Sequence, residues 1–146
     1  MKEVIIILSG GFDPVHKGHV RMFKAAKEYP AKVILGLNSD AWLTRKKGRP
    51  FMDWDERKEI LEVMNCVDEI YEFNDGDDSA CDLIERVVRN YKGDPNVKIY
   101  FGNGGDRTNS NSPEVNYCEE NDIELLWGVG GGKIQSSSDL IKNSNL

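Results

Sequence analysis

The sequence predicts an α/β fold, a Rossmann-like five-stranded parallel sheet with helices on both faces. Five short runs of aliphatic and β-branched residues lack the polar alternation of a half-exposed strand, which is typical of strands buried on both faces. Longer segments with apolar residues at helical spacing separate these runs. Strands that alternate with helices are joined by crossovers, and such crossovers make the strands parallel.

The first half of the chain supplies two of the strands and two helices. Residues 4–8 form an uninterrupted aliphatic run, and residues 33–37 form a second run with one glycine. A helix is expected over residues 20–29, where apolar side chains recur at helical spacing and a proline follows. Another helix is expected over residues 53–64, with Asp53 as its N-cap.

The second half adds three strands and three helices. Their expected positions are strand 69–73, a helix from residue 79, strand 97–101, a helix from residue 113, strand 123–127 and a short helix over 139–142. Ser79 followed by Asp82 approximates a capping box, which predicts a helix start there. Ser112 and Pro113 place a cap and a proline where a helix start favours them.

Composition and charge limit the classes of protein to which the chain can belong. It has 146 residues, of which 39% are hydrophobic and 30% charged, and this suits one domain over residues 1–146. The net charge of −6 argues against a nucleic-acid binder, because phosphate backbones attract positive surfaces. The longest aliphatic run has five residues, so neither a membrane span nor a signal peptide is expected.

The use of cysteine indicates a reducing compartment. Cys66, Cys81 and Cys118 are odd in number, widely spaced and without a CxxC pair. We interpret them as reduced, mostly buried thiols of a cytoplasmic protein.

The loop after the first strand, residues 9–19, contains both histidines of the chain, His16 and His19. Ligands of parallel sheets bind beyond the carboxyl ends of the strands, so this loop lies where a site is expected. Its glycines allow a ligand close to the backbone or to the N–H groups of a helix start: Gly10, Gly11 and Gly18. Imidazolium groups here could stabilise negative charge on a reacting phosphate.

Two other interpretations of the histidine pair follow from the residues alone. Each histidine could be an ordinary surface or core residue, or the two could ligate a metal from positions i and i+3. No third histidine or cysteine lies nearby in the sequence to complete a zinc site, so metal ligation is the weaker alternative.

The segment Gly-Phe-Asp-Pro-x-His-x-Gly-His resembles the HxGH signature of the cytidylyltransferase-like nucleotidyltransferases. The resemblance extends from Val4 to about Ile141. It implies transfer of a nucleoside monophosphate from a nucleoside triphosphate to a phosphorylated acceptor, with release of pyrophosphate. It also implies that His16 and His19 stabilise the transition state around the α-phosphate. The nucleotide contacts expected from this segment are Gly10, Gly11, Phe12, Asp13 and Gly18.

A basic run, residues 45–49, follows the second strand. By itself it could be a solvated loop or a localisation-like patch, but in this place it could also fold over a triphosphate. Glycerol-3-phosphate cytidylyltransferases carry a lysine-bearing loop here, and the resemblance aligns Lys46 with its first lysine and Lys47 or Gly48 with its second. Asp40 could cap a turn or helix, or it could face the acceptor or a metal-bound phosphate. We therefore expect Lys46 to be catalytic, and Asp40 and Lys47 to bind the acceptor.

Arg57 and Asp106 are further candidates for nucleotide binding. Glu56-Arg57 resembles a Glu-Arg pair of the family, so Arg57 is expected to hold the triphosphate rather than to make a surface ion pair. Asp106 ends a glycine-rich run and could accept hydrogen bonds from a ribose or a base, with a plain turn as the alternative. Heptose-1-phosphate adenylyltransferases have a lysine before Gly-Gly-Asp, where this chain has Asn103.

Three serines, Ser136, Ser137 and Ser138, precede the last expected helix. Hydroxyl groups at a helix start suit the β- and γ-phosphates, although simple N-capping needs only one of them. The family has an Ile-Ser-Thr-Thr or Ser-Ser-Thr block here. Cytidylyltransferases usually have an arginine five residues before the first serine, where this chain has Gly131, and Lys133 is the candidate replacement.

The resemblance leaves the choice between ATP and CTP open, because it divides between heptose-phosphate adenylyltransferases and choline- and glycerol-phosphate cytidylyltransferases. It implies Mg²⁺ as a cofactor that bridges the phosphates, with Asp13 or Asp106 as indirect contacts. It also implies a homodimer.

A nucleotide-binding regulatory module without catalysis is the alternative function. An NAD-dependent oxidoreductase is disfavoured, since no GxGxxG follows the first strand.

Overall fold

The computed structural model describes residues 3–28, 31–91, 94–104 and 112–129. The short helix expected over 139–142 lies outside these residues. Within them, no helix has the length and apolar character needed to cross a bilayer. Cys66, Cys81 and Cys118 are all free thiols, and burial raises the pKa of Cys118 to about 12.

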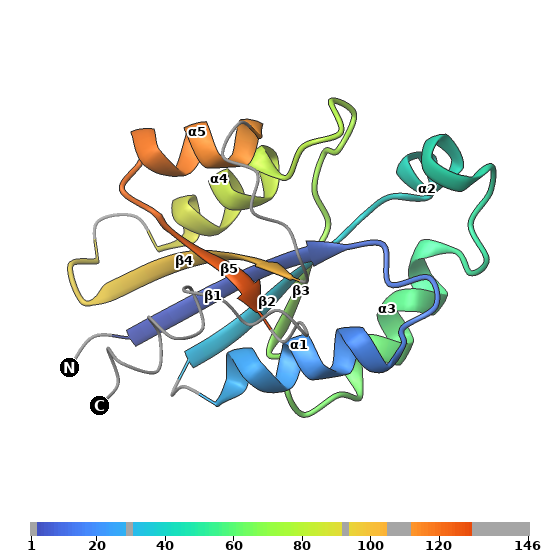
Figure 1. Cartoon of the computed structure of the whole chain (residues 1–146), viewed down its shortest axis with the longest axis horizontal. Coiled ribbons are helices and arrows are strands. Elements are labelled where there is room, and N and C mark those ends of the chain that lie inside the picture. The colour runs from blue at the N-terminus through green and yellow to red at the C-terminus, as the bar shows by residue number, and fades with distance from the viewer. Residues whose placement is uncertain (1–2, 29–30, 92–93, 105–111, 130–146) are drawn as a thin grey trace.

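A five-stranded, all-parallel sheet in the order β3-β2-β1-β4-β5 forms the centre of the fold (Figure 1). Its strands are β1 (Glu3–Gly10), β2 (Ala31–Leu37), β3 (Glu69–Tyr71), β4 (Val97–Gly104) and β5 (Glu124–Val129). Ile7 of the central β1 lies beside Ile34 of β2 on one side and Phe101 of β4 on the other. The strand order reverses at β1, so the loop after β1 is where a ligand is expected. The predicted fold class is confirmed.

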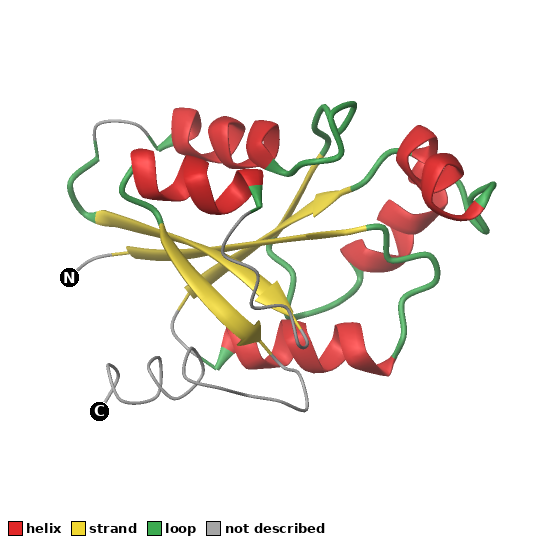
Figure 2. Ribbon diagram, turned by 45° about the horizontal axis from the view of Figure 1, so that its top comes forward, coloured by secondary structure: helices red, strands yellow, loops and turns green. Residues whose placement is uncertain are grey.

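Helices cover both faces of this sheet (Figure 2). The described residues contain α1 (Lys17–Lys27), α2 (Asp40–Lys47), α3 (Trp54–Glu62), α4 (Cys81–Asn90) and α5 (Pro113–Glu120). Helices α1 and α3 pack on one face, and α4 and α5 pack on the other. Helix α2 stands beyond the carboxyl ends of β1 and β2 (Figure 1).

Alternate side chains of β1 explain its all-apolar sequence. Ile6 and Leu8 join the core under α1 and α3, whereas Ile5 and Ile7 join the core under α4 and α5. None of the four has more than 2% of its surface exposed. A strand that is buried on both faces has no place for a polar residue.

Two of three helix starts lie where the sequence predicts them, and the third lies earlier. Asp53 caps α3 as expected, since its carboxylate accepts the N–H of Glu56 at 2.9 Å. Ser112 caps α5, and Pro113 is its first residue. Helix α1 begins at Lys17, three residues earlier than expected, because the side chain of His16 serves as its N-cap.

The capping box expected at Ser79 and Asp82 is wrong. The N-cap of α4 is Ala80, whose N–H donates to the buried carboxylate of Glu114 at 2.7 Å. Asp82 instead accepts the N–H of Asn74 at 2.7 Å. Glu114 of α5 thus holds the backbone just before α4 without capping the helix, and this contact between distant residues has no signal in the local sequence.

The basic run expected as a loop begins inside a helix. Helix α2 spans Asp40–Lys47, and the hydroxyl of its N-cap Ser39 accepts the N–H of Trp42 at 3.0 Å. Gly48 ends the helix with a φ of +94°, a backbone conformation that favours glycine. Three of the five residues in this run, Arg45, Lys46 and Lys47, therefore belong to the helix.

Candidate active site

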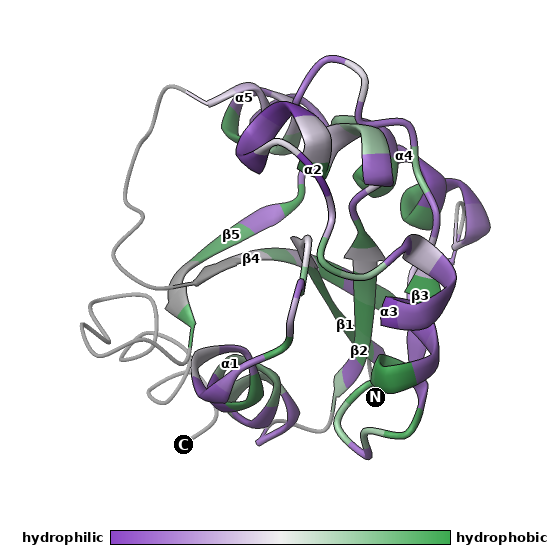
Figure 3. Cartoon of the chain, turned by 90° about the vertical axis from the view of Figure 1, so that its right-hand side faces the viewer, coloured by the Kyte–Doolittle hydropathy of each residue, from purple (hydrophilic) through white to green (hydrophobic). Residues whose placement is uncertain are grey.

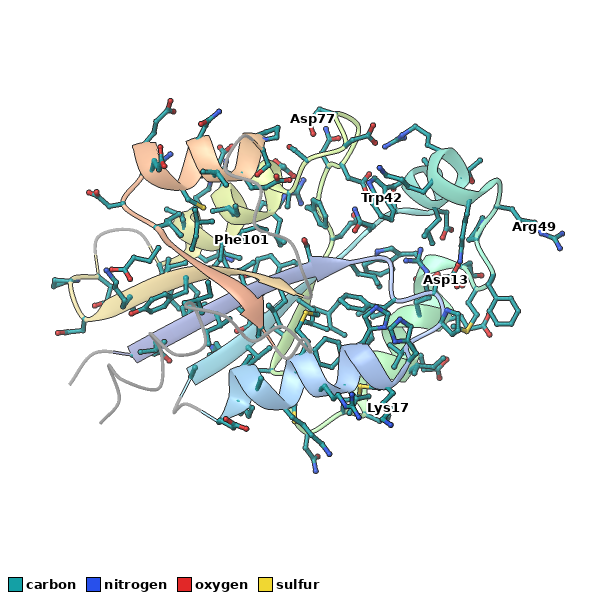
Figure 4. All side chains as sticks on the ribbon, in the orientation of Figure 1. Asp13, Lys17, Trp42, Arg49, Asp77 and Phe101 are labelled. Carbon is teal, nitrogen blue, oxygen red and sulfur yellow. The ribbon has the colours of Figure 1, made fainter. Side chains whose placement is uncertain are left out.

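The loop between β1 and α1, helix α2 and the start of α3 meet at the carboxyl edge of the sheet. Figure 3 looks onto this edge, with α1 and α2 on opposite sides of the strand ends. In Figure 4, Asp13 of the loop after β1 lies at this end of the molecule together with Trp42 of α2 and Arg49, which stands just after α2. The topology therefore brings together most of the described residues that the sequence singled out.

Phe12 anchors the loop that carries the two histidines. Its backbone has a φ of +49°, and only 3% of the residue is exposed. Its ring makes edge contacts with Phe23 and His19, at centroid distances of 5.4 and 4.9 Å. A positive φ is costly for an aromatic residue, so the packing of the ring has to hold this conformation. The ring of Phe12 thus packs against the imidazole of His19. Contact between Phe12 and a nucleotide stays a prediction.

His16 and His19 are brought together by the first turn of α1. Nδ1 of His16 accepts the N–H of Gly18 at 3.1 Å, and Nδ1 of His19 accepts the N–H of His16 at 3.1 Å. The two rings stack with their centroids 3.8 Å apart. The arrangement is a capping box in which two imidazoles take the places of the usual serine and glutamate. The N–H of Gly18, expected to be open to an anion, is already bonded to His16.

These hydrogen bonds determine where the protons of the two imidazoles lie. A ring nitrogen that accepts a hydrogen bond carries no proton, so each ring carries its proton on Nε2. Neither Nε2 has an acceptor among the described residues. Two Nε2–H donors on stacked rings are therefore available at the start of α1, and preorganised donors of this kind can bind an anionic oxygen.

His19 is uncharged near neutral pH. Its partial burial, and to a smaller extent the adjacent His16, lowers the pKa of His19 from 6.5 to about 4. The imidazolium expected from the sequence at this position is therefore wrong for the unliganded protein. His19 therefore presents a neutral imidazole with its proton on Nε2.

The low pKa of His19 predicts a loss of stability on acidification between the ordinary value of 6.5 and about 4. In this window the unfolded chain binds a proton at His19 and the folded chain does not, so a falling pH favours unfolding. We expect the Tm to fall between pH ~7 and pH ~5, and to fall less in His19→Asn, which has no titrating group at this position. Thermal unfolding followed by circular dichroism measures both slopes. Equal slopes would contradict this assignment.

Asp13 ties the connection between α2 and α3 to the histidine loop. Its carboxylate, of which 1% is exposed, accepts the N–H groups of Phe51 and Met52 at 2.6 and 2.8 Å. Nζ of Lys47 lies 2.9 Å from the same carboxylate and donates to the carbonyl of Asp13 at 2.6 Å. Burial raises the pKa of Asp13, but the hydrogen bonds from Lys47 and the two amides outweigh it and lower the pKa overall.

Replacing Asp13 by asparagine is expected to lower the free energy of unfolding by about 2 kcal/mol. The amide cannot pair with Lys47 and has one acceptor atom for two backbone donors. Urea denaturation measures the change. Glu59→Gln is the matched control, because Glu59 is an exposed carboxylate of α3, and its change should stay within about 0.5 kcal/mol. An equally small change for Asp13→Asn would show that the contacts of Asp13 with Lys47, Phe51 and Met52 contribute little to stability.

Arg57 lies beneath the site, with 0% of its side chain exposed. Its Nη1 donates to the carbonyls of Gly11 and Asn38, both at 2.8 Å. Nη2 donates to Asp40 at 2.7 Å, and Nε donates to the carbonyl of Met52 at 3.0 Å. Arg57 does pair with Asp40, but its side chain is buried, so the alternative of an ion pair on the helix surface is excluded. The predicted contact of Arg57 with a triphosphate stays a prediction, and in this structure the side chain is buried away from the surface. The structure supports a role as a clamp between three segments: the loop after β1, the start of α2 and the residues just before α3.

Two acidic side chains hold the start of α2. Asp40 pairs with Arg57 while 44% of its side chain remains exposed, so it keeps the access that acceptor binding requires. The buried carboxylate of Asp75 accepts hydrogen bonds from the side chain of Asn38 and from the N–H and hydroxyl of Ser39, at 2.7 to 2.9 Å. Burial raises the pKa of Asp75, but these hydrogen bonds lower it overall. Asp75 does not stand out in the sequence, because it lies in a polar, acidic loop.

The basic side chains of α2 differ in their contacts. Arg45 pairs with Asp78 at 2.9 Å, and Lys47 pairs with Asp13. Lys46 is exposed, and its Nζ lies 5.4 Å from the centre of the Trp42 ring. Among the described residues, Lys46 makes no ion pair. It is therefore the lysine of this helix that is available to an anionic ligand.

A cavity of about 370 Å³ borders the site between the ends of β2 and β3. Its lining includes Ser39, Trp54 and Arg86, and neither histidine. The cavity therefore does not mark the place where the histidines would meet a phosphate.

Four of the predicted nucleotide contacts lie outside the described residues: Asp106, Ser136, Ser137 and Ser138. The same holds for Gly131 and Lys133. Within the part of the chain that is described, no group of three or more histidine, cysteine or acidic side chains could hold a metal ion. Both oxygens of Asp13 are taken by amides and Lys47, so this carboxylate does not fit a metal ligand.

The sequence profile of the cytidylyltransferase-like family matches residues 7–118 of the chain. The chain is 42% identical over 85 residues to the bifunctional protein HldE of Geobacter metallireducens, a match over 57% of this chain and 17% of that protein. It is 35% identical over 146 residues to the bifunctional protein HldE of Geotalea uraniireducens, a match over 97% of this chain and 28% of that protein. The chain thus spans less than a third of the length of these relatives.

Two solved structures share the fold. The lipopolysaccharide core biosynthesis protein from Thermoplasma volcanium superposes with a TM-score of 0.62 at 17% identity, over 85% of this chain and 94% of that one. A bifunctional NMN adenylyltransferase/ADP ribose pyrophosphatase from Francisella tularensis, in complex with AMP and a manganese ion, superposes with a TM-score of 0.55 at 18% identity. That match covers 87% of this chain and 37% of the other.

Proposed function

Because the chain belongs to the cytidylyltransferase-like family, we propose that it is a nucleotidyltransferase that transfers a nucleoside monophosphate to a small phosphorylated acceptor. Pyrophosphate is the second product. The nucleotide we favour is ATP, since the chain resembles bifunctional HldE proteins and heptose-phosphate adenylyltransferases. The acceptor is a sugar or polyol phosphate, such as heptose 1-phosphate or glycerol 3-phosphate.

The paired Nε2–H donors of His16 and His19 carry this proposal. They stand at the start of α1, on the loop after the central strand, where the helix dipole also favours an anion. Donors whose positions are already set by backbone hydrogen bonds need no reorganisation when charge develops in the transition state. This geometry supports contact with the α- and β-phosphates.

The reaction follows as a direct, in-line displacement. A phosphate oxygen of the acceptor attacks the α-phosphorus, the new P–O bond forms, and the bond to the pyrophosphate oxygen breaks with its electron pair. His16 and His19 donate hydrogen bonds to the oxygens that gain charge, and Lys46 neutralises part of that charge. Neither a covalent intermediate nor a nucleophilic side chain is required. Asp40, which stays partly exposed, would orient the acceptor, and Lys47 would add positive charge beside it while bound to Asp13.

Mg²⁺ is proposed as part of the nucleoside triphosphate complex that the protein binds. The described residues do not fit a metal site of their own, as the saturated carboxylate of Asp13 illustrates. Mg²⁺ commonly keeps several waters and binds through substrate phosphates, so few protein ligands are needed. Asp106 stays the candidate for an indirect contact. A homodimer is proposed by analogy with the family.

Product identification tests the proposed function. The purified protein would be incubated with Mg²⁺, each of ATP, CTP, GTP and UTP, and each of heptose 1-phosphate, glycerol 3-phosphate and phosphocholine. Mass spectrometry should detect one nucleoside diphosphate-linked product, formed from ATP and a sugar or polyol phosphate. A product formed only from CTP would correct the nucleotide. Tight binding of nucleotide without any product would favour the regulatory module.

A further inference from the structure

We propose that Trp42 is a specificity-determining residue, which packs against the ring of a cyclic phosphorylated acceptor while Lys46 binds its phosphate. The inference rests on the proposed function, because it assigns the acceptor side of the same site. It predicts selection of a pyranose phosphate over open-chain glycerol 3-phosphate and over cationic phosphocholine.

The indole of Trp42 lies directly against the histidine loop. A Cβ atom added to Gly11 would lie 3.3 Å from Cζ3 of Trp42 and 2.8 Å from Cδ2 of Leu43. Gly11 thus lets α2 approach this loop more closely than any other residue would allow. Trp42 is only partly buried, and Gly11, which it approaches, stands in the same loop as His16 and His19.

Trp54 provides an internal comparison. Its Nε1–H donates to the carbonyl of Leu37 at 3.1 Å, and this bond uses its polar atom inside the fold. The Nε1–H of Trp42 has no acceptor among the described residues. A partly exposed indole with an unused donor can pack its apolar face on a ligand and donate to one of its hydroxyl groups. Trp42 has this combination and Trp54 lacks it.

The helix that carries Trp42 is attached to its surroundings on both sides of this residue. Ser39, its N-cap, is bonded to the buried Asp75 at 2.7 and 2.8 Å. Arg45 donates to the carbonyl of Asp75 at 2.8 Å, and Lys47 is bound to Asp13. The helix is therefore attached to the loops after β3 and β1 on both sides of Trp42. A preorganised aromatic surface binds with a smaller loss of conformational entropy than a mobile one.

Lys46 determines which acceptors fit beside Trp42. Its ammonium lies 5.4 Å from the centre of the ring and has no ion pair in the described part of the chain. A phosphate draws the ammonium toward itself and exposes the ring face for the sugar. A quaternary ammonium ligand would compete with Lys46 for the same face and meet its like charge, which disfavours phosphocholine.

Binding can be followed without catalysis. The chain has three tryptophans and hence three indole N–H signals in an NMR spectrum, which Trp42→Phe and Trp54→Phe assign. Titration with glucose 1-phosphate, in the presence of ATP, should shift the Trp42 signal and leave the Trp54 signal in place. Glycerol 3-phosphate and inorganic phosphate should shift the Trp42 signal much less. A Trp42 signal that does not move, or moves equally with all three, would overturn the proposal.

Kinetics provide the second readout. Trp42→Ala should raise the KM of the acceptor roughly three- to tenfold, with the KM of the nucleotide unchanged and most of the effect rescued by Trp42→Phe. Trp54→Phe is the control and should leave the acceptor KM unchanged. Equal changes in both KM values would indicate a merely structural role. If no nucleotide is transferred by the wild type, the NMR titration still decides whether Trp42 binds a pyranose phosphate, so the two proposals fail separately.

Discussion

Replacing His16 by alanine is expected to lower kcat about 10²–10³-fold, the usual cost of removing one preorganised donor from a developing oxyanion. The Nε2–H of His16 is one of two such donors at the start of α1. The KM of the nucleotide should change less than kcat, because the interaction strengthens as charge develops. Steady-state kinetics with saturating acceptor measure both constants.

The control for His16→Ala has to separate catalysis from helix capping. The same side chain caps α1 by accepting the N–H of Gly18, and loss of a cap costs about 1 kcal/mol of stability. His16→Ser restores an N-cap but does not extend to a phosphate. We expect His16→Ser to unfold close to the wild-type denaturant midpoint and to remain as slow as His16→Ala. A serine variant with near-normal kcat would exclude His16 from the catalytic machinery.

Replacing Arg57 by methionine is expected to lower the free energy of unfolding by about 3–5 kcal/mol, which is a large part of the stability of an ordinary domain. Methionine has a similar length but leaves the carbonyls of Gly11, Asn38 and Met52 without their donor. Buried acceptors that lose their partner cost their full desolvation free energy. Urea denaturation at neutral pH measures the change.

Two variants serve as controls for Arg57→Met. Arg89 makes an exposed ion pair with Glu85 on α4, and Arg89→Met should cost less than about 1 kcal/mol. Asp40→Asn keeps an acceptor for Arg57 and should cost less than loss of the guanidinium. If Arg57→Met were as mild as Arg89→Met, the four hydrogen bonds of Arg57 would not hold the segments together.

Much of the fold could be predicted from the sequence because the strands are buried on both faces. The run at residues 4–8 contains no polar residue, and the structure places its alternate side chains in two separate cores. Caps formed within a few residues, such as Asp53 and Ser112, were also predictable. The strand order 3-2-1-4-5 then places the histidine loop at the reversal of strand order.

Features that depend on contacts between distant residues could not be predicted in this way. Helix α2 buries only Leu43 and ends in a run of basic residues, so its sequence resembles a polar loop. Arg57 stands within a charged helix, and nothing in the local pattern distinguishes it from a surface arginine. The hydrogen bond from Ala80, just before α4, to Glu114 also joins residues far apart in the sequence. In each case, the decisive partner lies in another element of the fold.

In the candidate site, too, the sequence indicates the residues, and the structure shows their contacts. The motif identified His16 and His19 as candidates, but only the structure shows that each accepts a backbone hydrogen bond at Nδ1 and keeps its proton on Nε2. The sequence suggested Asp13 as a contact near the metal, whereas the structure shows its carboxylate bound to the segment after α2. Residue types thus predicted which loop carries the candidate site, and tertiary contacts determine which of its atoms are available to a ligand.

Acceptor-dependent release of pyrophosphate tests the central claim most directly. The purified protein, with Mg²⁺ and ATP or CTP, should release pyrophosphate only when a suitable sugar or polyol phosphate is added, in a one-to-one ratio with the nucleotide-linked product. His16→Ser should suppress this release. A wild-type protein that binds none of the four nucleoside triphosphates, and releases no pyrophosphate with any acceptor, would contradict the account.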